Sequence, residues 1–197
     1  MGEHYNHKKI RKAKTAQRGC VIWFTGLPGS GKSTLANGLE KRLNETHLHS
    51  YILDGDIVRQ GLNNDLGFSP RDRAENIRRI GEVCKLFIDA GVFVLAAFIS
   101  PYHAHRDMVR KLFREADFIE IYVKCPVLEC ERRDPKGLYR KARVGQLENF
   151  TGITAPYEEP LNPEIIIETN ILSLNDAIDL IIENLIKMGF LYYNTSL

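Results

Sequence analysis

Residues 26–34 read Gly26-Leu27-Pro28-Gly29-Ser30-Gly31-Lys32-Ser33-Thr34, and this stretch decides the fold of the 197-residue chain. It matches G-x-x-x-x-G-K-[ST], the phosphate-binding loop of enzymes that use nucleoside triphosphates. Residues 21–25 before it are β-branched or aromatic and predict a buried strand, and apolar residues at helical spacing follow from 32 to 43. A strand, a glycine loop and a helix aim backbone N–H groups at a polyphosphate. The motif therefore predicts a nucleoside triphosphate site.

Two side chains of the loop carry the chemistry of this prediction. Lys32 can reach the β- and γ-phosphates of ATP, and the Ser33 hydroxyl can ligate Mg²⁺. A glycine-rich turn without a ligand is the alternative, but the matching strand and helix on either side disfavour it.

Composition bounds the class of protein. Hydrophobic residues make up 44% and charged residues 26%, which is typical of an ordinary globular domain, and a net charge of +2 gives no argument for nucleic acid or for a membrane surface. No apolar run is long enough to span a membrane. The four cysteines contain no C-x-x-C pair, so we expect free thiols and a reducing compartment, the cytoplasm.

Apolar segments alternate with amphipathic ones, which predicts an α/β fold in three layers, with a central, mostly parallel sheet flanked by helices. Helices are expected after Ser69 and Ser173, each of which has an aspartate three residues later in capping-box spacing. Residues 1–18 are rich in lysine and arginine and predict a solvated tail, so the domain would be 19–197. The expected strands are 20–25, 50–53, 92–98, 118–123 and 165–168.

One segment does not fit the alternation. Residues 132–163 are basic and irregular, with glycines, three prolines and little apolar periodicity. Inside a nucleotide-binding domain such a segment predicts a lid that closes over phosphates, at about residues 132–160. A solvated surface loop is the alternative.

Polar residues follow the expected strands at the edge where ligands bind in parallel sheets. Asp54 and Asp56 come directly after the second strand, and phosphoryl transfer to a hydroxyl needs a carboxylate that can take the proton. Arg73 and Asn76 lie three apart on one helix face, where they could hold an anionic acceptor. The turn-rich segment 61–70 is too polar for the core, and His103 and His105 are expected at the surface.

The chain resembles the adenylylsulfate kinase (APS kinase) family, of the P-loop kinase superfamily, over roughly residues 19 to 190. The resemblance is carried by GLPGSGKST at 26–34, by DGDIVRQGLNNDLGFSPRDRAENIRRIGEV at 54–83 and by FISPY at 98–102. It continues with CERRDPKGLYRKARVGQLENFTGI at 130–153 and PYEEP at 156–160. Two positions depart from the common pattern, Pro28, where many members have serine, and Thr154, where many have aspartate.

The resemblance implies transfer of the γ-phosphoryl group of ATP, with Mg²⁺, to the ribose 3′-hydroxyl of adenosine 5′-phosphosulfate (APS), giving 3′-phosphoadenosine 5′-phosphosulfate (PAPS). It implies a homodimer, and Asp54 as the general base beside Asp56. In some members the serine matching Ser100 is described as a phosphoserine intermediate, whereas direct in-line transfer needs no covalent step. For the acceptor the resemblance implies that Phe68 and Phe150 sandwich the adenine. The other implied acceptor contacts come from Asp56, Arg59, Arg73, Asn76, Ile99, Ser100 and Lys136, of which Lys136 belongs to the lid and reaches the phosphates. For the ATP adenine it implies contacts from Arg132, Thr169 and Asn170.

Three other functions would use the same phosphate loop. A gluconate, shikimate or nucleoside monophosphate kinase is the nearest, and the set of Phe68, Arg73, Asn76 and Phe150 favours a nucleotide acceptor over a sugar acid. A guanine nucleotide switch is disfavoured because the Asn-Lys-x-Asp motif is missing. A pseudo-kinase is disfavoured because Lys32, Ser33 and both aspartates are intact.

Overall fold

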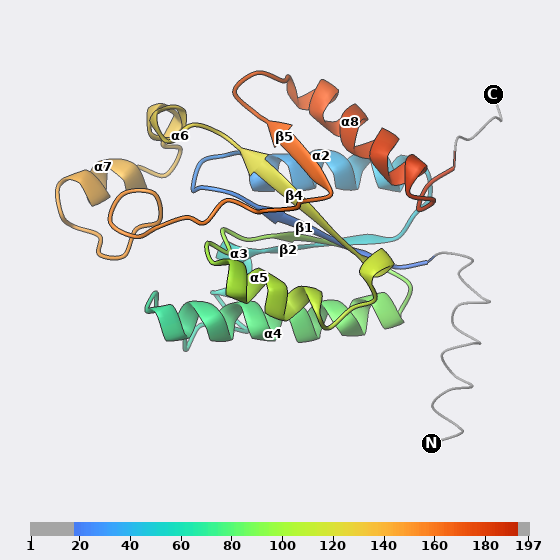
Figure 1. The fold of residues 1–197 in the computed structure, drawn as a ribbon, viewed down its shortest axis with the longest axis horizontal. Coiled ribbons are helices and arrows are strands. Elements are labelled where there is room, and N and C mark those ends of the chain that lie inside the picture. Colours follow the sequence, from blue (N-terminus) through green and yellow to red (C-terminus); the bar gives the residue numbers. More distant parts are fainter. Residues whose placement is uncertain (1–17, 193–197) are drawn as a thin grey trace.

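The structure, a computed structural model, describes residues 18–192. Its centre is a parallel sheet of five strands in the order β2-β3-β1-β4-β5. Helices cover both faces of this sheet (Figure 1), so the predicted three-layer α/β fold is confirmed. The strands are β1 (Val21–Thr25), β2 (Ser50–Asp54), β3 (Phe93–Ala97), β4 (Phe118–Lys124) and β5 (Ile165–Glu168), close to the predicted ranges.

The two faces of the sheet bury different sets of side chains. Helices α2 (Lys32–Glu45) and α8 (Leu174–Lys187) lie on one face, and α4 (Pro70–Asp89) and α5 (His103–Arg110) lie on the other (Figure 1). Ile22 of β1 packs in the first core, whereas its neighbour Trp23 packs in the second. All of β1 is buried, as expected for a strand covered on both faces.

Both predicted capping boxes are present. The Ser69 hydroxyl accepts a 3.2 Å hydrogen bond from the N–H of Asp72 at the start of α4. The Ser173 hydroxyl does the same with the N–H of Asp176, also at 3.2 Å, at the start of α8. These bonds satisfy N–H groups that have no partner inside the helix, which explains why both helices begin where the sequence predicted.

Several short helices were not predicted. They are α3 (Gly55–Val58), α6 (Val127–Arg133), α7 (Leu138–Arg143), a 3₁₀ turn at Glu115–Asp117, and α5 itself. The polar segment 103–110 forms α5 and buries Arg106, which is 3% exposed. The segment 61–70 is not wholly outside the core either, since Asn63 is 0% exposed. Both corrections concern polar side chains that are buried because they have partners.

The segment that contains α6 and α7 lies at the end of the sheet where the parallel strands finish (Figure 1). Among residues 18–192, no helix combines the length and the apolar character needed to cross a membrane. The predicted basic tail, residues 1–18, lies outside the described residues except for Arg18, whose guanidinium pairs with Asp117 at 2.7 Å.

Candidate active site

A cavity of about 680 Å³ opens at the carboxyl ends of the strands. Its walls come from the phosphate loop, the end of β2 with α3, the start of α4, the segment after β3, and the segment around α7. It therefore gathers residues from five parts of the sequence. Of the predicted site residues, those that line it are Pro28, Gly29, Gly31, Lys32, Ser33, Thr34, Asp54, Asp56, Arg59, Phe68, Arg73, Asn76, Ile99, Ser100, Lys136 and Phe150.

The phosphate loop has the conformation that its glycines permit. Gly31 adopts a left-handed φ of 103° and caps the N-terminus of α2. Gly26 must lack a side chain, because a Cβ atom there would lie 2.5 Å from the carbonyl oxygen of Val123. The loop thus sits directly against the end of β4, with the positive end of α2 beside the cavity.

Lys32 lies within this loop and is 9% exposed. Its Nζ atom donates to the carbonyl oxygens of Gly26 at 3.0 Å and Leu27 at 2.7 Å. Burial lowers the pKa of the Lys32 ammonium from 10.5 to about 8, because the charged form loses its hydration. The group is thus a buried donor at the place where a polyphosphate would lie.

Asp54 connects the sheet with the phosphate loop. Its Oδ2 atom accepts a 2.5 Å hydrogen bond from the Ser33 hydroxyl, and its Oδ1 atom accepts from the N–H of Asp56 at 2.9 Å, which caps α3. Asp56 in turn forms an ion pair with Lys136, from the segment before α7. The structure thus brings both predicted carboxylates and Lys136 together beside the loop.

Oxygen atoms of Ser33 and Asp54 offer a hard donor set that suits Mg²⁺. Within residues 18–192, no cluster of three or more histidine, cysteine, aspartate or glutamate side chains is arranged to hold a metal. A donor set this small fits a cation that takes one or two protein oxygens and completes its shell with substrate phosphates and water.

Arg59, Phe68 and Arg73 form a basic and aromatic wall of the cavity, here called the acceptor wall. The Arg59 guanidinium lies 4.4 Å from the centre of the Phe68 ring, and that of Arg73 lies 5.8 Å from it. Arg73 also donates to the carbonyls of Phe68 at 3.0 Å and Asn149 at 2.6 Å. Burial lowers the pKa of both guanidinium groups, which still carry their charge at neutral pH. Phe68 is 59% exposed, so its ring is open to a ligand.

Phe150 lines the same cavity. Its ring packs edge-on against Tyr139 with centroids 5.0 Å apart, and the Tyr139 hydroxyl donates to the carbonyl of Pro28 at 2.9 Å. Through Tyr139, Phe150 is therefore tied to the phosphate loop. Phe68 and Phe150 both line the cavity, as their predicted shared role requires.

Asn76, on the first turns of α4, is 6% exposed and lines the cavity. Its side-chain oxygen accepts a 3.0 Å hydrogen bond from the side chain of Asn63. Sequence reasoning missed Asn63, because one asparagine in a turn-rich segment carries no signal of burial.

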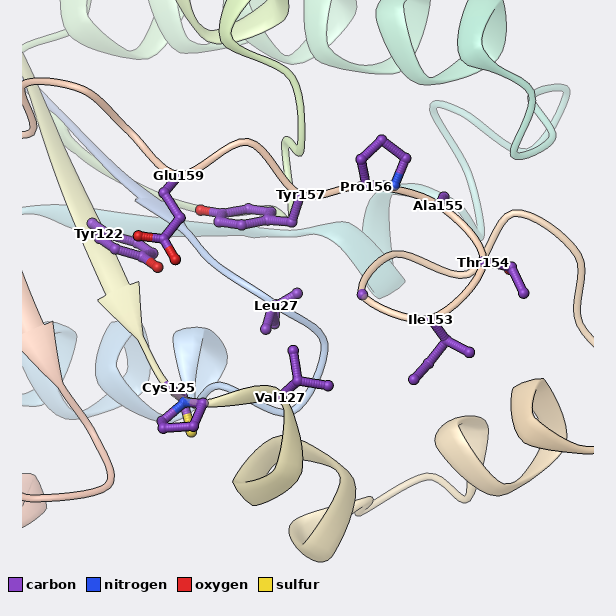
Figure 2. Close-up of a pocket in the computed structure, with 12 residues that line it drawn as sticks. Leu27, Tyr122, Cys125, Val127, Ile153, Thr154, Ala155, Pro156, Tyr157 and Glu159 are labelled. Carbon is purple, nitrogen blue, oxygen red and sulfur yellow. The ribbon is translucent and has the colours of Figure 1, made fainter.

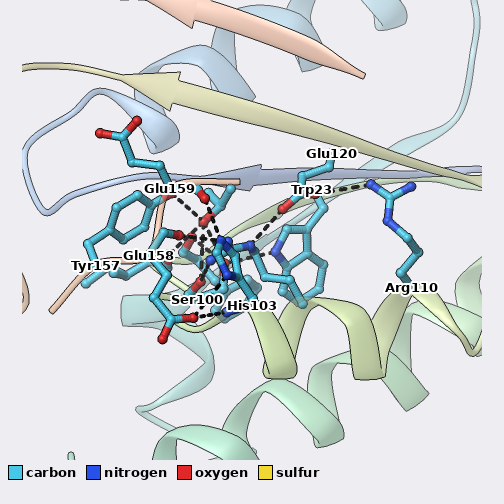
Figure 3. Close-up of polar contacts among 12 residues, drawn as sticks. Trp23, Ser100, His103, Arg110, Glu120, Tyr157, Glu158 and Glu159 are labelled. Atoms are coloured by element: carbon cyan, nitrogen blue, oxygen red, sulfur yellow. Dashed lines mark hydrogen bonds and ion pairs between the residues drawn. The ribbon is translucent and has the colours of Figure 1, made fainter. Parts of the chain in front are cut away.

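Ser100 follows β3 with a left-handed φ of 38° and is 2% exposed. Its hydroxyl accepts from Trp23 Nε1 at 3.0 Å and donates to Thr25 Oγ1 at 2.9 Å. Thr25 Oγ1 donates to the carbonyl of Ile99 at 2.8 Å. Both hydrogen-bonding roles of the Ser100 hydroxyl are therefore taken within the protein (Figure 3).

Arg106 of α5 is a further residue that sequence reasoning missed. Its guanidinium donates to the carbonyls of Ser100 and Glu158, both at 2.7 Å, and pairs with Glu120 at 2.9 Å. Arg110 extends this network by pairing with Glu120 at 3.1 Å (Figure 3). The network joins the wall of the cavity at Ser100 to the chain that returns from the segment around α7.

The residues predicted for the ATP adenine are less closely grouped. Thr169 donates to the carbonyl of Ser30 at 2.8 Å and so touches the phosphate loop. The side chain of Arg132 is 75% exposed and pairs with Glu129 at 2.7 Å, and Asn170 is exposed. Neither lines the cavity, whereas Arg133 does and donates to the Thr169 carbonyl at 2.7 Å. Nothing in the sequence distinguishes Arg133 from Arg132.

A second pocket, of about 550 Å³, lies behind the phosphate loop (Figure 2). Its lining is mostly apolar and aromatic, with Leu27, Tyr122 and Tyr157 around it and Glu159 at one side. Of the predicted site residues only Leu27 reaches it, so the predicted chemistry belongs to the first cavity.

Comparison with known proteins identifies the family. The family model described as adenylylsulphate kinase matches residues 18–168. The adenylyl-sulfate kinase of Geotalea uraniireducens is 62% identical over 169 residues, 86% of this chain and 81% of that protein. The probable adenylyl-sulfate kinase of Bacillus subtilis is 56% identical over 184 residues, 93% of this chain and 92% of that protein.

One solved structure is similar in both sequence and fold. It is the Mycobacterium tuberculosis APS kinase CysC in complex with AMPPNP and APS, with a TM-score of 0.83 and 47% identity. The match covers 86% of this chain and 98% of that one. With the phosphate loop, the two carboxylates and the basic wall in one cavity, these matches show that the chain belongs to the adenylylsulfate kinase family.

Proposed function

We propose that the protein transfers the γ-phosphoryl group of ATP to the 3′-hydroxyl of APS and releases PAPS and ADP. One observation carries the proposal: a single cavity holds the phosphate loop, Asp54, and the wall of Arg59, Phe68 and Arg73. The relative of known structure binds AMPPNP and APS together, which supports a site for two nucleotides in this chain as well.

Asp54 is the proposed general base. Its carboxylate lies beside the Ser33 hydroxyl, so a 3′-hydroxyl placed next to the γ-phosphate would also lie within its reach. As the hydroxyl oxygen attacks phosphorus, Asp54 takes its proton and the bond to the bridging oxygen of ADP breaks. Lys32 donates to the phosphates, with its pKa raised again by their charge. Mg²⁺, held on the protein side by Ser33, would neutralise charge on the phosphate oxygens.

The acceptor is positioned by charge and by stacking. Arg59 and Arg73 offer guanidinium groups for the phosphosulfate, because a planar fork of N–H donors matches the oxygens of such an anion. Phe68 and Phe150 would hold the adenine between them, and Asn76 and the backbone at Ile99 and Ser100 would complete the contacts. Aligning the two reactants supplies much of the rate enhancement in phosphoryl transfer.

The segment 132–160 acts as the lid in this proposal. Lys136 pairs with Asp56 at the edge of the cavity, and its ammonium group would move from Asp56 to the phosphates when ATP is bound. Arg132 is exposed enough to turn from Glu129 to the ATP adenine, beside Thr169 and Asn170. Closure of such a segment excludes water from the transferred phosphoryl group.

The transfer is direct in this proposal. Ser100 is 2% exposed and its hydroxyl is hydrogen-bonded to Trp23 and Thr25, which disfavours it as a phosphoryl acceptor. Asp54 lines the same cavity and is partly exposed.

A kinase for gluconate, shikimate or a nucleoside monophosphate is the alternative. The test is ADP release with Mg-ATP and APS, in parallel with gluconate, shikimate and AMP as acceptors. We expect turnover with APS alone. Turnover with another acceptor and none with APS would overturn the proposal and leave the phosphate loop as the supported part.

Two further features of the protein are proposed rather than observed. Four buried free thiols suit a reducing compartment, so we place the protein in the cytoplasm. We propose a homodimer from the family resemblance, and light scattering of the purified full chain would test it.

A further inference from the structure

Asn63 is a fully buried asparagine beside the acceptor wall. It lies in the turn between α3 and α4 and is 0% exposed. Its backbone N–H donates to the carbonyl of Val58 at 2.9 Å, and its own carbonyl accepts from the N–H of Leu66 at 3.2 Å. These two bonds fix the backbone of Asn63 in the turn.

The Asn63 side chain determines which group Asn76 offers to the cavity. Asn63 Nδ2 donates to Asn76 Oδ1 at 3.0 Å, which turns the oxygen of the Asn76 amide toward Asn63. The NH₂ group of Asn76 is then left for the cavity that Asn76 lines.

The opposite orientation of this amide pair is less favourable. In the observed orientation Asn63 Oδ1 is a buried oxygen without a partner among the described residues. If both amides turned over, the buried group without a partner would be the Asn63 NH₂. An orphaned N–H is tolerated less well in protein interiors than an oxygen with free lone pairs. The pair therefore presents Asn76 as a donor.

We propose that Asn63 is a positioning residue for the acceptor, which makes Asn76 an obligatory hydrogen-bond donor. Arg59 and Arg73 line the same cavity as Asn76 and can also only donate. The wall then consists of donors alone and selects a ligand that presents oxygen acceptors, such as a phosphate, a sulfate or a ribose hydroxyl. The inference deepens the proposed function and rests on it for the identity of the acceptor.

Asn63→Asp tests this with little change of shape. The ionised carboxylate of this variant cannot donate to Asn76 Oδ1, so at a pH at which it is ionised the Asn76 amide must turn over and present its oxygen to the acceptor. The acceptor then loses the hydrogen bond from the Asn76 NH₂ group, and its oxygens are repelled by the Asn76 oxygen. We therefore expect the KM for APS to rise roughly 10- to 100-fold. The Kd for an ATP analogue should stay unchanged, because Asn63 does not contact the phosphate loop. The Asn63→Ala variant removes the donor at every pH.

Asn64→Asp is the matched control, since it makes the same chemical change on the exposed neighbour in the same turn. A double-mutant cycle with Asn76→Ala separates positioning from general damage to the turn. Once Asn76 is alanine, Asn63→Asp should add no further loss in kcat/KM for APS. Should Asn63→Asp fail to fold, Asn63→Ala removes the donor without burying a charge and enters the same cycle.

The inference is overturned if the Asn63 and Asn64 variants have the same KM for APS, or if the losses from Asn63 and Asn76 multiply. Its failure is distinct from that of the proposed function, which fails if the wild-type protein does not turn over APS. In that case the cycle is measured with whichever acceptor is turned over, because Asn76 lines the same cavity for any acceptor.

Discussion

The hydroxyl of Ser33 donates a 2.5 Å hydrogen bond to the carboxylate of Asp54. Ser33 belongs to the phosphate loop and Asp54 ends β2, a strand at the edge of the sheet. Their contact therefore places the proposed base beside the phosphate loop. It also gives the base a fixed orientation, because the second oxygen of Asp54 caps α3.

Asp54→Ala should lose most turnover and retain ATP binding. A positioned general base contributes about 10²–10⁴-fold to the rate, while the loop backbone and Lys32 still hold the phosphates. ADP release with APS measures the first quantity, and titration with a fluorescent ATP analogue measures the second. Asp179→Ala is the control, since this aspartate is exposed and lies on α8. A kcat near that of the wild type would exclude Asp54 as the base.

Ser100→Ala should retain measurable turnover and lose stability. Without the hydroxyl, the buried Trp23 Nε1 loses its hydrogen-bond acceptor, which costs about 1–3 kcal/mol in the free energy of unfolding. Urea unfolding measures this loss. Incubation of the wild type with γ-labelled ATP should leave no label on the denatured protein. A labelled Ser100, together with an inactive Ser100→Ala variant, would establish a phosphoserine route instead.

The features that sequence reasoning predicted are local ones. The residues of the phosphate loop are contiguous, and the capping pairs that begin at Ser69 and Ser173 each lie within four residues. Such short spacings can be recognised in the sequence alone. The apolar runs of the strands are equally local. Assigning roles to Arg59, Phe68 and Phe150 needed the family resemblance, because separate polar and aromatic residues carry no spacing signal.

The residues that were missed are polar groups buried by partners far away in the sequence. Arg106 meets Glu158 from 52 residues away, and Asn63 meets Asn76 from 13 residues away. Polarity alone predicts exposure for such residues, whereas the structure buries them together with hydrogen-bond partners, even though Asn63 Oδ1 has no partner among the described residues. The segment around α7 is also held by contacts outside itself, such as Tyr139 with Pro28, rather than by apolar periodicity.

Affinity for ATP should fall as the pH rises above about 8. The pKa of Lys32 is lowered from 10.5 to about 8 by burial, so in the free protein the ammonium loses its proton above this pH. Phosphates raise that pKa again, so binding above about pH 8 must take up a proton and becomes weaker as pH rises. Calorimetry in buffers of different ionisation enthalpy measures the proton uptake. Lys32→Met should bind weakly at every pH, without this dependence.

The lowered pKa of Lys32 changes folding stability in the opposite direction from ATP affinity as the pH rises. Between about pH 8 and 10.5 the unfolded chain keeps the Lys32 proton and the folded chain does not, so the contribution of this group to stability rises with pH. Weaker binding in that range therefore cannot be attributed to unfolding caused by Lys32. Binding that stayed constant from pH 7 to 10 would contradict the assignment.

Lys136→Met should reduce turnover while leaving stability nearly unchanged. The ion pair between Lys136 and Asp56 joins side chains that are 55% and 65% exposed, and such pairs contribute at most about 1 kcal/mol. The loss in rate is expected because the proposed lid would then bring one cation fewer to the phosphates. Kinetics with both substrates and thermal unfolding measure the two effects. Lys141→Met, an exposed lysine on α7, is the matched control and should change neither.

Arg106→Met should destabilise the protein by about 3–5 kcal/mol, because it removes one partner of a buried ion pair. Arg106 and Glu120 have side chains that are 3% and 8% exposed, and the change also leaves the carbonyls of Ser100 and Glu158 without their donor. Arg42→Met is the control, since its pair with Asp179 is exposed and should contribute at most about 1 kcal/mol. Urea unfolding gives both values.

The double variant Arg106→Met/Glu120→Met tests the cause of that loss. If the uncompensated Glu120 charge is responsible, replacing it as well should recover part of the stability, although Arg110 then loses one of its two carboxylate partners. If the lost carbonyl contacts are responsible, the double variant should be no more stable than Arg106→Met alone. Equal losses for Arg106→Met and Arg42→Met would contradict both explanations, because burial of the pair would then have no measurable effect.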